Sequence, residues 1–90
     1  MTLHVVTYDL RKPGRNYDGL IDHLQSYAGW WHCLESMWFV ESTLTAAELR
    51  DKIRTFVDAN DGVLVMDVRT RSWATLGLSN QCNTWLKENL

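Results

Sequence analysis

Cysteine is scarce in this chain, and its two residues, Cys33 and Cys82, belong to no local motif. Two cysteines without CxxC spacing are too few for a disulfide scaffold. We therefore expect reduced thiols, as in a cytoplasmic protein. No His-x-x-His or Cys/His spacing indicates a zinc site. Ser36 lacks a nucleophile-elbow motif, which argues against a serine hydrolase.

Long apolar runs and a strong net charge are also missing. No segment approaches the roughly 20 apolar residues of a membrane-spanning helix. No charged-then-apolar leader precedes the first predicted strand, so we expect neither a membrane association nor a signal peptide. A net charge of −2 and a pI near 5.8 argue mildly against tight nonspecific binding of nucleic acid, which depends on Lys and Arg neutralising phosphates.

Apolar residues, by contrast, are abundant for the size of the chain. The 90 residues are 46% hydrophobic and include five tryptophans. A domain this small buries a modest fraction of its surface. We therefore expect part of the apolar surface at a subunit interface, which predicts a homodimer. The alternative is a monomer with a tryptophan-rich core.

The most informative segment is residues 4–10, a run of β-branched and aromatic residues that predicts a strand. A Pro-Gly pair shortly afterwards stops it. The apolarity of the run predicts a place in the middle of a sheet. Asp9 would then lie at the strand's end, at the rim of the core. The adjoining loop carries three cations: Arg11, Lys12 and Arg15.

Asp9 has two interpretations. It can accept hydrogen bonds from the amides of the loop that follows, which is the more common role of such a residue. It can also bind Mg²⁺, which takes oxygen ligands, often one or two carboxylates together with waters and substrate phosphates. One aspartate per chain supplies few ligands for Mg²⁺. Two copies of Asp9 across a dimer axis would make a better one.

The middle of the chain predicts a helix and two strands. Apolar residues recur at helical spacing over residues 17–27, with Asn16 as the N-cap and Gly29 as a C-terminal stop. Residues 30–40 have no helical period. We expect two short strands there, separated near Glu35 and Ser36.

The second half predicts another helix, a strand and a tail. Thr45 and Glu48 form a capping box. An apolar stripe follows it, made by Leu49, Ile53, Phe56 and Val57. Residues 63–68 predict the last core strand, and a short helix begins near Asn80. That helix is too short to be stable alone in water, so it must dock.

The order βαββαβ predicts an α+β fold: a ferredoxin-like sandwich with a four-stranded antiparallel sheet and two helices on one face. The first and third strands would be central. We expect a single domain over residues 1–90, with its core at 3–68 and a C-terminal extension at 69–90 that ends in the short helix. The extension or a second subunit would cover the other face of the sheet.

Residues 30–32 place two tryptophans and a histidine where a helix gives way to a strand. If they are exposed, rings such as Trp31 and His32 can stack on the bases of single-stranded nucleic acid. Alternatively, the tryptophans plug the end of the core or seal a dimer, which we favour for at least one of them. His32 is also a candidate proton shuttle near neutral pH.

These segments together resemble a known family. A strand ending in Tyr8-Asp9, a helix, a Ser-Met-Trp-Phe strand at 36–39 and Leu-Thr-Ala-Ala-Glu-Leu-Arg at 44–50 are similar to the small CRISPR-associated adaptation nucleases, antiviral defence proteins related to the VapD-type toxin ribonucleases. The resemblance covers residues 3–68. It implies a ferredoxin-like fold, a homodimer, and Asp9 as the metal ligand for phosphodiester cleavage.

Members of that family cut RNA, cut double-stranded DNA or only bridge DNA, so the fold does not decide the activity. Our first hypothesis is a cytoplasmic dimer acting on RNA or DNA. Paired Asp9 residues would hold Mg²⁺, which polarises a phosphate and activates water. Arg11, Lys12 and Arg15 would position the backbone. The alternative is a non-catalytic scaffold whose tryptophan-rich surface binds a protein partner.

Overall fold

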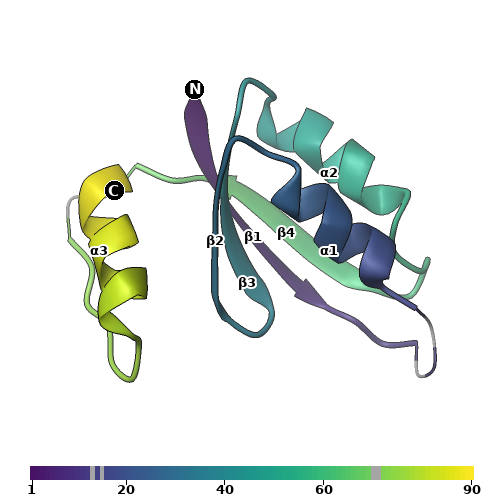
Figure 1. Cartoon of the computed structure of the whole chain (residues 1–90). Helices are drawn as coiled ribbons and strands as arrows, with labels where there is room; N and C mark the ends of the chain where they lie inside the picture. The colour runs from purple at the N-terminus through teal and green to yellow at the C-terminus, as the bar shows by residue number, and fades with distance from the viewer. Residues whose placement is uncertain (13, 15, 70–71) are drawn as a thin grey trace.

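The computed structural model describes residues 1–12, 14, 16–69 and 72–90. The fold is α+β, with four strands and three helices in the described ranges (Figure 1). In chain order the elements are β1 (Thr2–Asp9), α1 (Asp18–Gln25), β2 (Gly29–Leu34), β3 (Met37–Ser42), α2 (Ala46–Arg54), β4 (Gly62–Asp67) and α3 (Asn80–Asn89). None of these helices is long and apolar enough to cross a membrane.

The four strands form one antiparallel sheet in the order β2-β3-β1-β4. The prediction that the first and third strands are central is confirmed. In β1, Val6 lies between Trp38 of β3 and Val65 of β4, and its side chain is fully buried. Because β1 has hydrogen-bonded neighbours on both edges, its side chains can contact elements on both faces of the sheet, which suits its apolar run.

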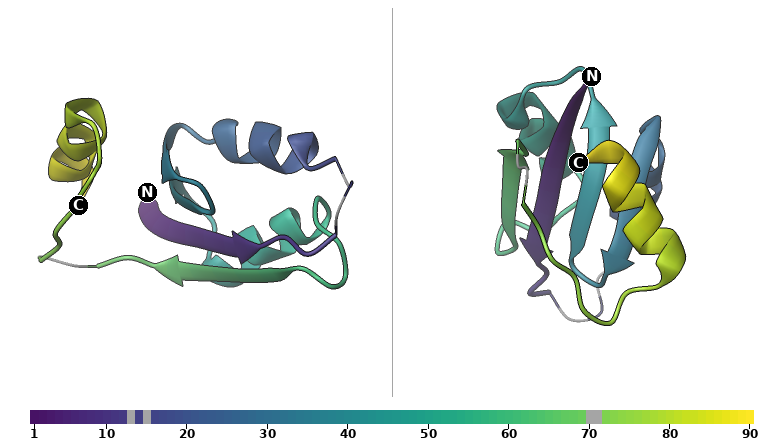
Figure 2. Two further views of the ribbon diagram at one scale, coloured as in Figure 1. Left: turned by 90° about the horizontal axis from the view of Figure 1, so that it is seen from below. Right: turned by 90° about the vertical axis from the view of Figure 1, so that its left-hand side faces the viewer.

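The two faces of the sheet have different covers. Alternate side chains of β1 point to opposite faces. On one face they join a cluster with helices α1 and α2: Val6, Leu20, Leu24, Trp38, Val40, Leu49 and Ile53. On the other face a smaller cluster contains Val5, Trp31, Phe39 and Leu86 of α3. Figure 2 shows α3 on the opposite side of the sheet from α1 and α2.

Helix α3 covers only part of its face. Its partners lie on β2, β3 and β1. On the outer strand β4, Leu64 and Met66 remain 54% and 51% exposed. They pair with Thr7 and Val5 of β1, so by alternation they lie on the α3 side of the sheet. The C-terminal extension therefore covers β2, β3 and Val5 of β1, while β4 and the end of β1 around Thr7 and Asp9 stay open; we call this uncovered region the open half of the face.

Local capping signals were partly confirmed. The capping box is present: the Thr45 hydroxyl accepts from the Glu48 amide, and the Glu48 carboxylate accepts from the Thr45 amide. For α1 the N-cap is Tyr17. Asn16, predicted for that role, lies one residue earlier and accepts a hydrogen bond from the Asp18 amide at 2.8 Å.

The prediction that Gly29 ends the first helix is wrong. α1 ends at Gln25, and Gly29 is the first residue of β2. A left-handed conformation is not the reason for glycine here, because its φ is not positive. A Cβ at Gly29 would lie 2.7 Å from a carboxylate oxygen of Glu41 on the neighbouring strand, so a larger residue here requires the Glu41 side chain to move.

The prediction of reduced thiols is also wrong. Cys33 of β2 and Cys82 of α3 form a disulfide. The two residues are 49 positions apart in the sequence. They meet because α3 folds back over β2, a tertiary contact that no local spacing encodes. The bridge therefore ties the C-terminal extension to an edge strand of the sheet.

His23 on α1 provides a pH-sensitive contact with the turn that follows α2. Its ring stacks on Phe56 with the centroids 4.9 Å apart, and its Nε2 lies 2.8 Å from the Tyr27 hydroxyl. Burial lowers the pKa of His23 below its ordinary value of 6.5, and the nearby Lys52 cation lowers it further. The folded state thus favours the neutral imidazole.

We predict that His23 makes the protein less stable as the pH falls. Because the unfolded chain binds this proton more tightly, its contribution is fully present above about pH 6.5 and is lost as the pH falls through 6.5 toward the lower folded-state pKa. Urea unfolding at about pH 7.5 and about pH 5.5 measures the loss, which should be smaller in His23→Gln than in the wild type.

Lys52→Gln is the matched control, because it removes the nearby charge while keeping the histidine and should reduce the loss in part. Titration of Glu48 does not contribute to the difference in stability between about pH 7.5 and about pH 5.5. Hydrogen bonds from Thr45 hold the pKa of Glu48 below its ordinary value of 4.5, so it titrates below this range. An equal loss in wild type and His23→Gln would contradict the assignment.

Candidate functional site

Asp9 is the last residue of β1, and its carboxylate points into solvent. It pairs with Gly62, the first residue of β4, and its side chain is 73% exposed. By alternation along β1, Asp9 and Thr7 lie on the same face as Val5, which is the face that α3 covers in part. The predicted position at the end of a central strand is confirmed.

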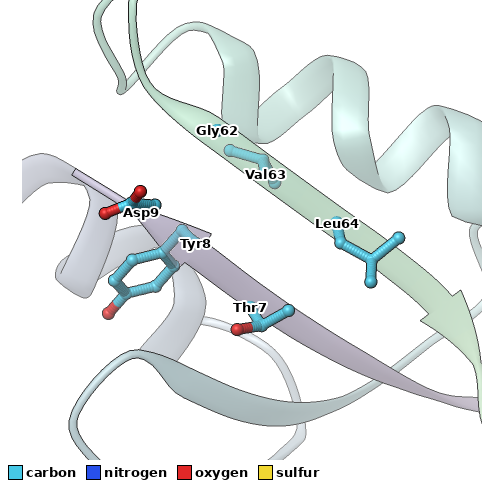
Figure 3. A pocket seen from close by; sticks show the side chains of 6 residues that line it. All are labelled: Thr7, Tyr8, Asp9, Gly62, Val63 and Leu64. Atoms are coloured by element: carbon cyan, nitrogen blue, oxygen red, sulfur yellow. The ribbon is translucent and has the colours of Figure 1, made fainter. Parts of the chain in front are cut away.

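A shallow hollow of about 310 Å³ lies beside this carboxylate. Figure 3 shows its walls, which come from the ends of two adjacent strands. They are Thr7, Tyr8 and Asp9 of β1 and Gly62, Val63 and Leu64 of β4. Leu64 is directly opposite Thr7. The exposed carboxylate therefore shares a hollow with one of the two exposed apolar side chains of β4.

Arg11 pairs with Asp9 and ties it to the neighbouring turn. Its Nε donates to Asp9 Oδ2 at 3.1 Å, and its Nη1 donates to the Asn60 carbonyl at 3.1 Å. Gly62 leaves room for this guanidinium, since a Cβ there would lie 3.1 Å from Nη2. Asp9 thus has a structural partner, as the sequence allowed; within the described part of the loop this partner is the Arg11 side chain and no backbone amide.

The other two predicted cations of this loop are Lys12 and Arg15. Lys12 Nζ lies 3.6 Å from the Asp58 carboxylate. Arg15 lies outside the described residues. Because Arg11 and Lys12 each face a carboxylate of this chain, much of their positive charge is compensated before any phosphate approaches. Both pairs are half-exposed or more at the cation, where solvent screens such interactions.

Asp61 is the residue that sequence reasoning missed. It accepts hydrogen bonds from the Arg11 amide at 2.6 Å, the Tyr17 hydroxyl at 2.7 Å and the Asp58 amide at 2.7 Å. Asp61 therefore joins the loop after β1 to the turn before β4. The Asn-Asp-Gly sequence at residues 60–62 is typical of a turn, but the long-range partners of Asp61 have no local signature.

Trp31 and His32 lie on β2, two strands away from Asp9. Trp31 is only 4% exposed, and its indole N–H donates to the Cys82 carbonyl at 3.1 Å. While α3 is docked, Trp31 serves the core, the role that we favoured for at least one tryptophan. His32 lies flat against Trp38, with centroids 3.8 Å apart, and one ring nitrogen is 3.0 Å from the Glu35 carbonyl.

A row of aromatic rings connects the two regions. His32 of β2 stacks on Trp38 of β3, and Trp38 Nε1 donates to the Tyr8 hydroxyl of β1 at 3.0 Å. This row lies on the α1–α2 side of the sheet, because Trp38 and Tyr8 belong to that cluster. It fixes the residue next to Asp9, while Asp9 itself points to the other face.

A single chain does not fit a divalent cation at this site. Among the described residues, no group of three or more His, Cys, Asp or Glu side chains could hold a metal ion. Asp9 contributes one carboxylate, and Arg11 already occupies one of its oxygens. The predicted Mg²⁺ would therefore need ligands from a second chain.

No protein-family model matches the chain, and no solved structure matches it. The resemblance to the small CRISPR-associated nucleases thus stays a prediction from the sequence, and the geometry of the Asp9 site must be weighed by itself.

We predict that Asp61 matters more than Asp9 for stability. Asp61→Ala leaves three donors without their acceptor and should cost about 2–4 kcal/mol. Asp9→Ala breaks an exposed ion pair and should cost less than about 1 kcal/mol. Chemical denaturation of both variants measures the difference, and Asp61→Asn, which keeps an acceptor oxygen, should fall between them. Equal costs for the two alanine variants, or a larger cost for Asp9→Ala, would contradict the greater structural role of Asp61.

Proposed function

We propose that this protein works as a homodimer that acts on nucleic acid, with the Asp9 carboxylates of two copies at its centre. The observation that carries the proposal is that Asp9 and the uncovered apolar side chains of β4 belong to the same face. The element order and the strand order β2-β3-β1-β4 support a ferredoxin-like sandwich as the scaffold.

The open half of the sheet face supports a dimer. Leu64 and Met66 are neighbours on one strand and are both more than half exposed. Adjacent apolar side chains on a flat sheet surface favour association. In a two-fold dimer the same patch meets its own copy. The dimer that we propose has its two-fold axis near the Leu64 end of the patch, because only then do the two Asp9 residues, which share a hollow with Leu64, approach each other.

Such a dimer would bring together carboxylates for a metal ion and guanidinium groups for a phosphate, which supports action on nucleic acid. Two Asp9 carboxylates are as many as Mg²⁺ often takes from protein, with waters and phosphate oxygens completing the shell. A bound metal supplies charge stabilisation at a phosphate. Arg11 uses Nε and Nη1 within the chain, and a guanidinium has further N–H donors for a phosphate.

A non-catalytic scaffold is the second candidate, and one observation favours it. Arg11 faces Asp9 and Lys12 faces Asp58, while the whole chain carries a net charge of −2. A surface whose cations are already paired attracts phosphate weakly. In that case the same dimer would bind a protein partner through apolar side chains.

We predict that the wild type is a dimer that cleaves labelled single-stranded RNA or double-stranded DNA with Mg²⁺ or Mn²⁺. Asp9→Asn should remain a dimer and lose cleavage, because the amide is a poor ligand for a hard cation. Leu64→Glu should remain folded, become a monomer and lose cleavage. Sedimentation equilibrium, circular dichroism and a cleavage assay measure the three properties.

Asp22→Asn, an exposed aspartate on α1, is the matched control and should keep both dimer and cleavage. A monomeric wild type would overturn the dimer. A dimer that cuts neither substrate would overturn the nuclease and leave the scaffold.

We also predict that affinity for nucleic acid falls steeply with salt. Arg11→Ala should reduce the slope of log affinity against log salt by about 1 per chain, as the loss of one phosphate contact does. Arg50→Ala, on α2 and paired with Asp51, should leave the slope unchanged. Binding that is insensitive to salt, or an equal change in both variants, would favour the protein-binding scaffold.

A further inference from the structure

Helix α3 contacts the sheet through one covalent tie and a set of side-chain contacts. Among the described residues these include the Cys33–Cys82 disulfide, the hydrogen bond from the Trp31 indole to the Cys82 carbonyl, and an apolar cluster around Leu86 in which the Trp85 ring stacks on Phe39. Residues 72–77 before it are exposed. A ten-residue helix is marginal by itself in water. The disulfide is therefore the covalent tie of a helix that otherwise depends on side-chain packing to stay on the sheet.

A hollow of about 220 Å³ opens beside the disulfide. It lies between β2 and α3, and both cysteines belong to its wall. The full lining is Trp30, Trp31, His32, Cys33, Gln81, Cys82 and Trp85. Both cysteines are partly exposed. The disulfide therefore lies at the wall of a hollow that opens to solvent, and this hollow is the route by which a small thiol would approach it.

We propose that the Cys33–Cys82 disulfide is a reducible latch that holds α3 over the sheet and is opened by a dithiol that enters this hollow. The thiolate of the dithiol attacks one cysteine sulfur, forms a mixed disulfide and releases the other cysteine as a thiolate. The second thiol of the dithiol then displaces the remaining cysteine. The protein disulfide gains two electrons and two protons, and the dithiol becomes a disulfide.

Opening the latch changes the surface of the sheet. With α3 undocked, Trp31, Phe39 and Val5, which are now buried beneath it, become accessible. They lie on the same face as Leu64 and Met66. Reduction would thus join the covered half and the open half into one apolar surface. The latch itself is independent of the proposed function; only a consequence for dimerisation would rest on it.

Amide hydrogen exchange on the whole chain, with and without dithiothreitol, tests the latch. In the oxidised protein, residues 80–89 should be protected. Reduction should speed their exchange by roughly 30-fold or more, the typical effect of losing a disulfide constraint. β1 and β3 should not change, and reoxidation should restore the protection. Cys82→Ser should exchange rapidly with or without the reductant.

Alkylation followed by mass measurement establishes the redox state in each sample. Two alkylated cysteines in the native protein without reductant would overturn the disulfide. Unchanged exchange of α3 after complete reduction would overturn the latch. Equal acceleration in β1, β3 and α3 would show a bridge that stabilises the whole fold, which also overturns it. None of these readouts depends on dimerisation or on nucleic acid.

The rate of reduction tests the role of the hollow. Gln81→Phe should fill the space beside the disulfide and slow the reaction with dithiothreitol, while α3 in the oxidised state keeps its exchange protection. Asn80→Phe, also exposed on α3 but outside the lining, is the matched control and should leave the rate unchanged. Equal rates in the two variants and the wild type would overturn access through the hollow.

Discussion

The pairing of β1 with both β3 and β4 is the constraint on which the rest of the structure depends. Because β1 is central, its alternate residues supply both cores: Val6 packs under α1 and α2, and Val5 packs under α3. The same pairing decides where Asp9 lies. Asp9 ends this strand, and pairing with Gly62 fixes its backbone. Its exposed side chain can still contact either Arg11 or a group from another molecule.

Local patterns predicted the elements well, because the interactions that define them are local. The capping box joins Thr45 and Glu48, which are three residues apart. The alternation in β1 depends only on the order of consecutive residues in that strand. The failures involve contacts between distant segments. Nothing near Cys33 indicates Cys82, and nothing near Gly29 indicates that Glu41 will occupy the space of a side chain. The site shows the same division: Asp9 was found from its strand, but the bonds of Asp61 to Arg11 and Tyr17 were not.

Polar groups show why the pattern of residue types underdetermines a site. Asp9, Asp58 and Asp61 all lie close to the loop that carries the cations, and each accepts from it or pairs with it. A loop rich in Arg and Lys therefore holds the ends of two strands together before it can hold a phosphate. His4, in contrast to these paired aspartates, is a buried polar residue. It is 1% exposed on a central strand, and within the described residues its Nδ1 has no hydrogen-bond partner, a cost that the surrounding apolar packing must offset.

The open half of the sheet follows from the widths of the elements. Strands in a sheet lie roughly 4.8 Å apart, and a helix with its side chains is about 10 Å across. One helix can therefore cover about two strands, and two helices side by side can cover four. The α1–α2 face meets this requirement, and Val63 and Val65 of β4 are packed there. The opposite face has only α3 among the described helices, so β4 and the Asp9 end of β1 are left uncovered once β2, β3 and Val5 of β1 are covered. That Leu64 and Met66 are apolar at this location is then a property of the sequence that the packing of a single copy does not use, and a second molecule on this half-face is the arrangement that would use it.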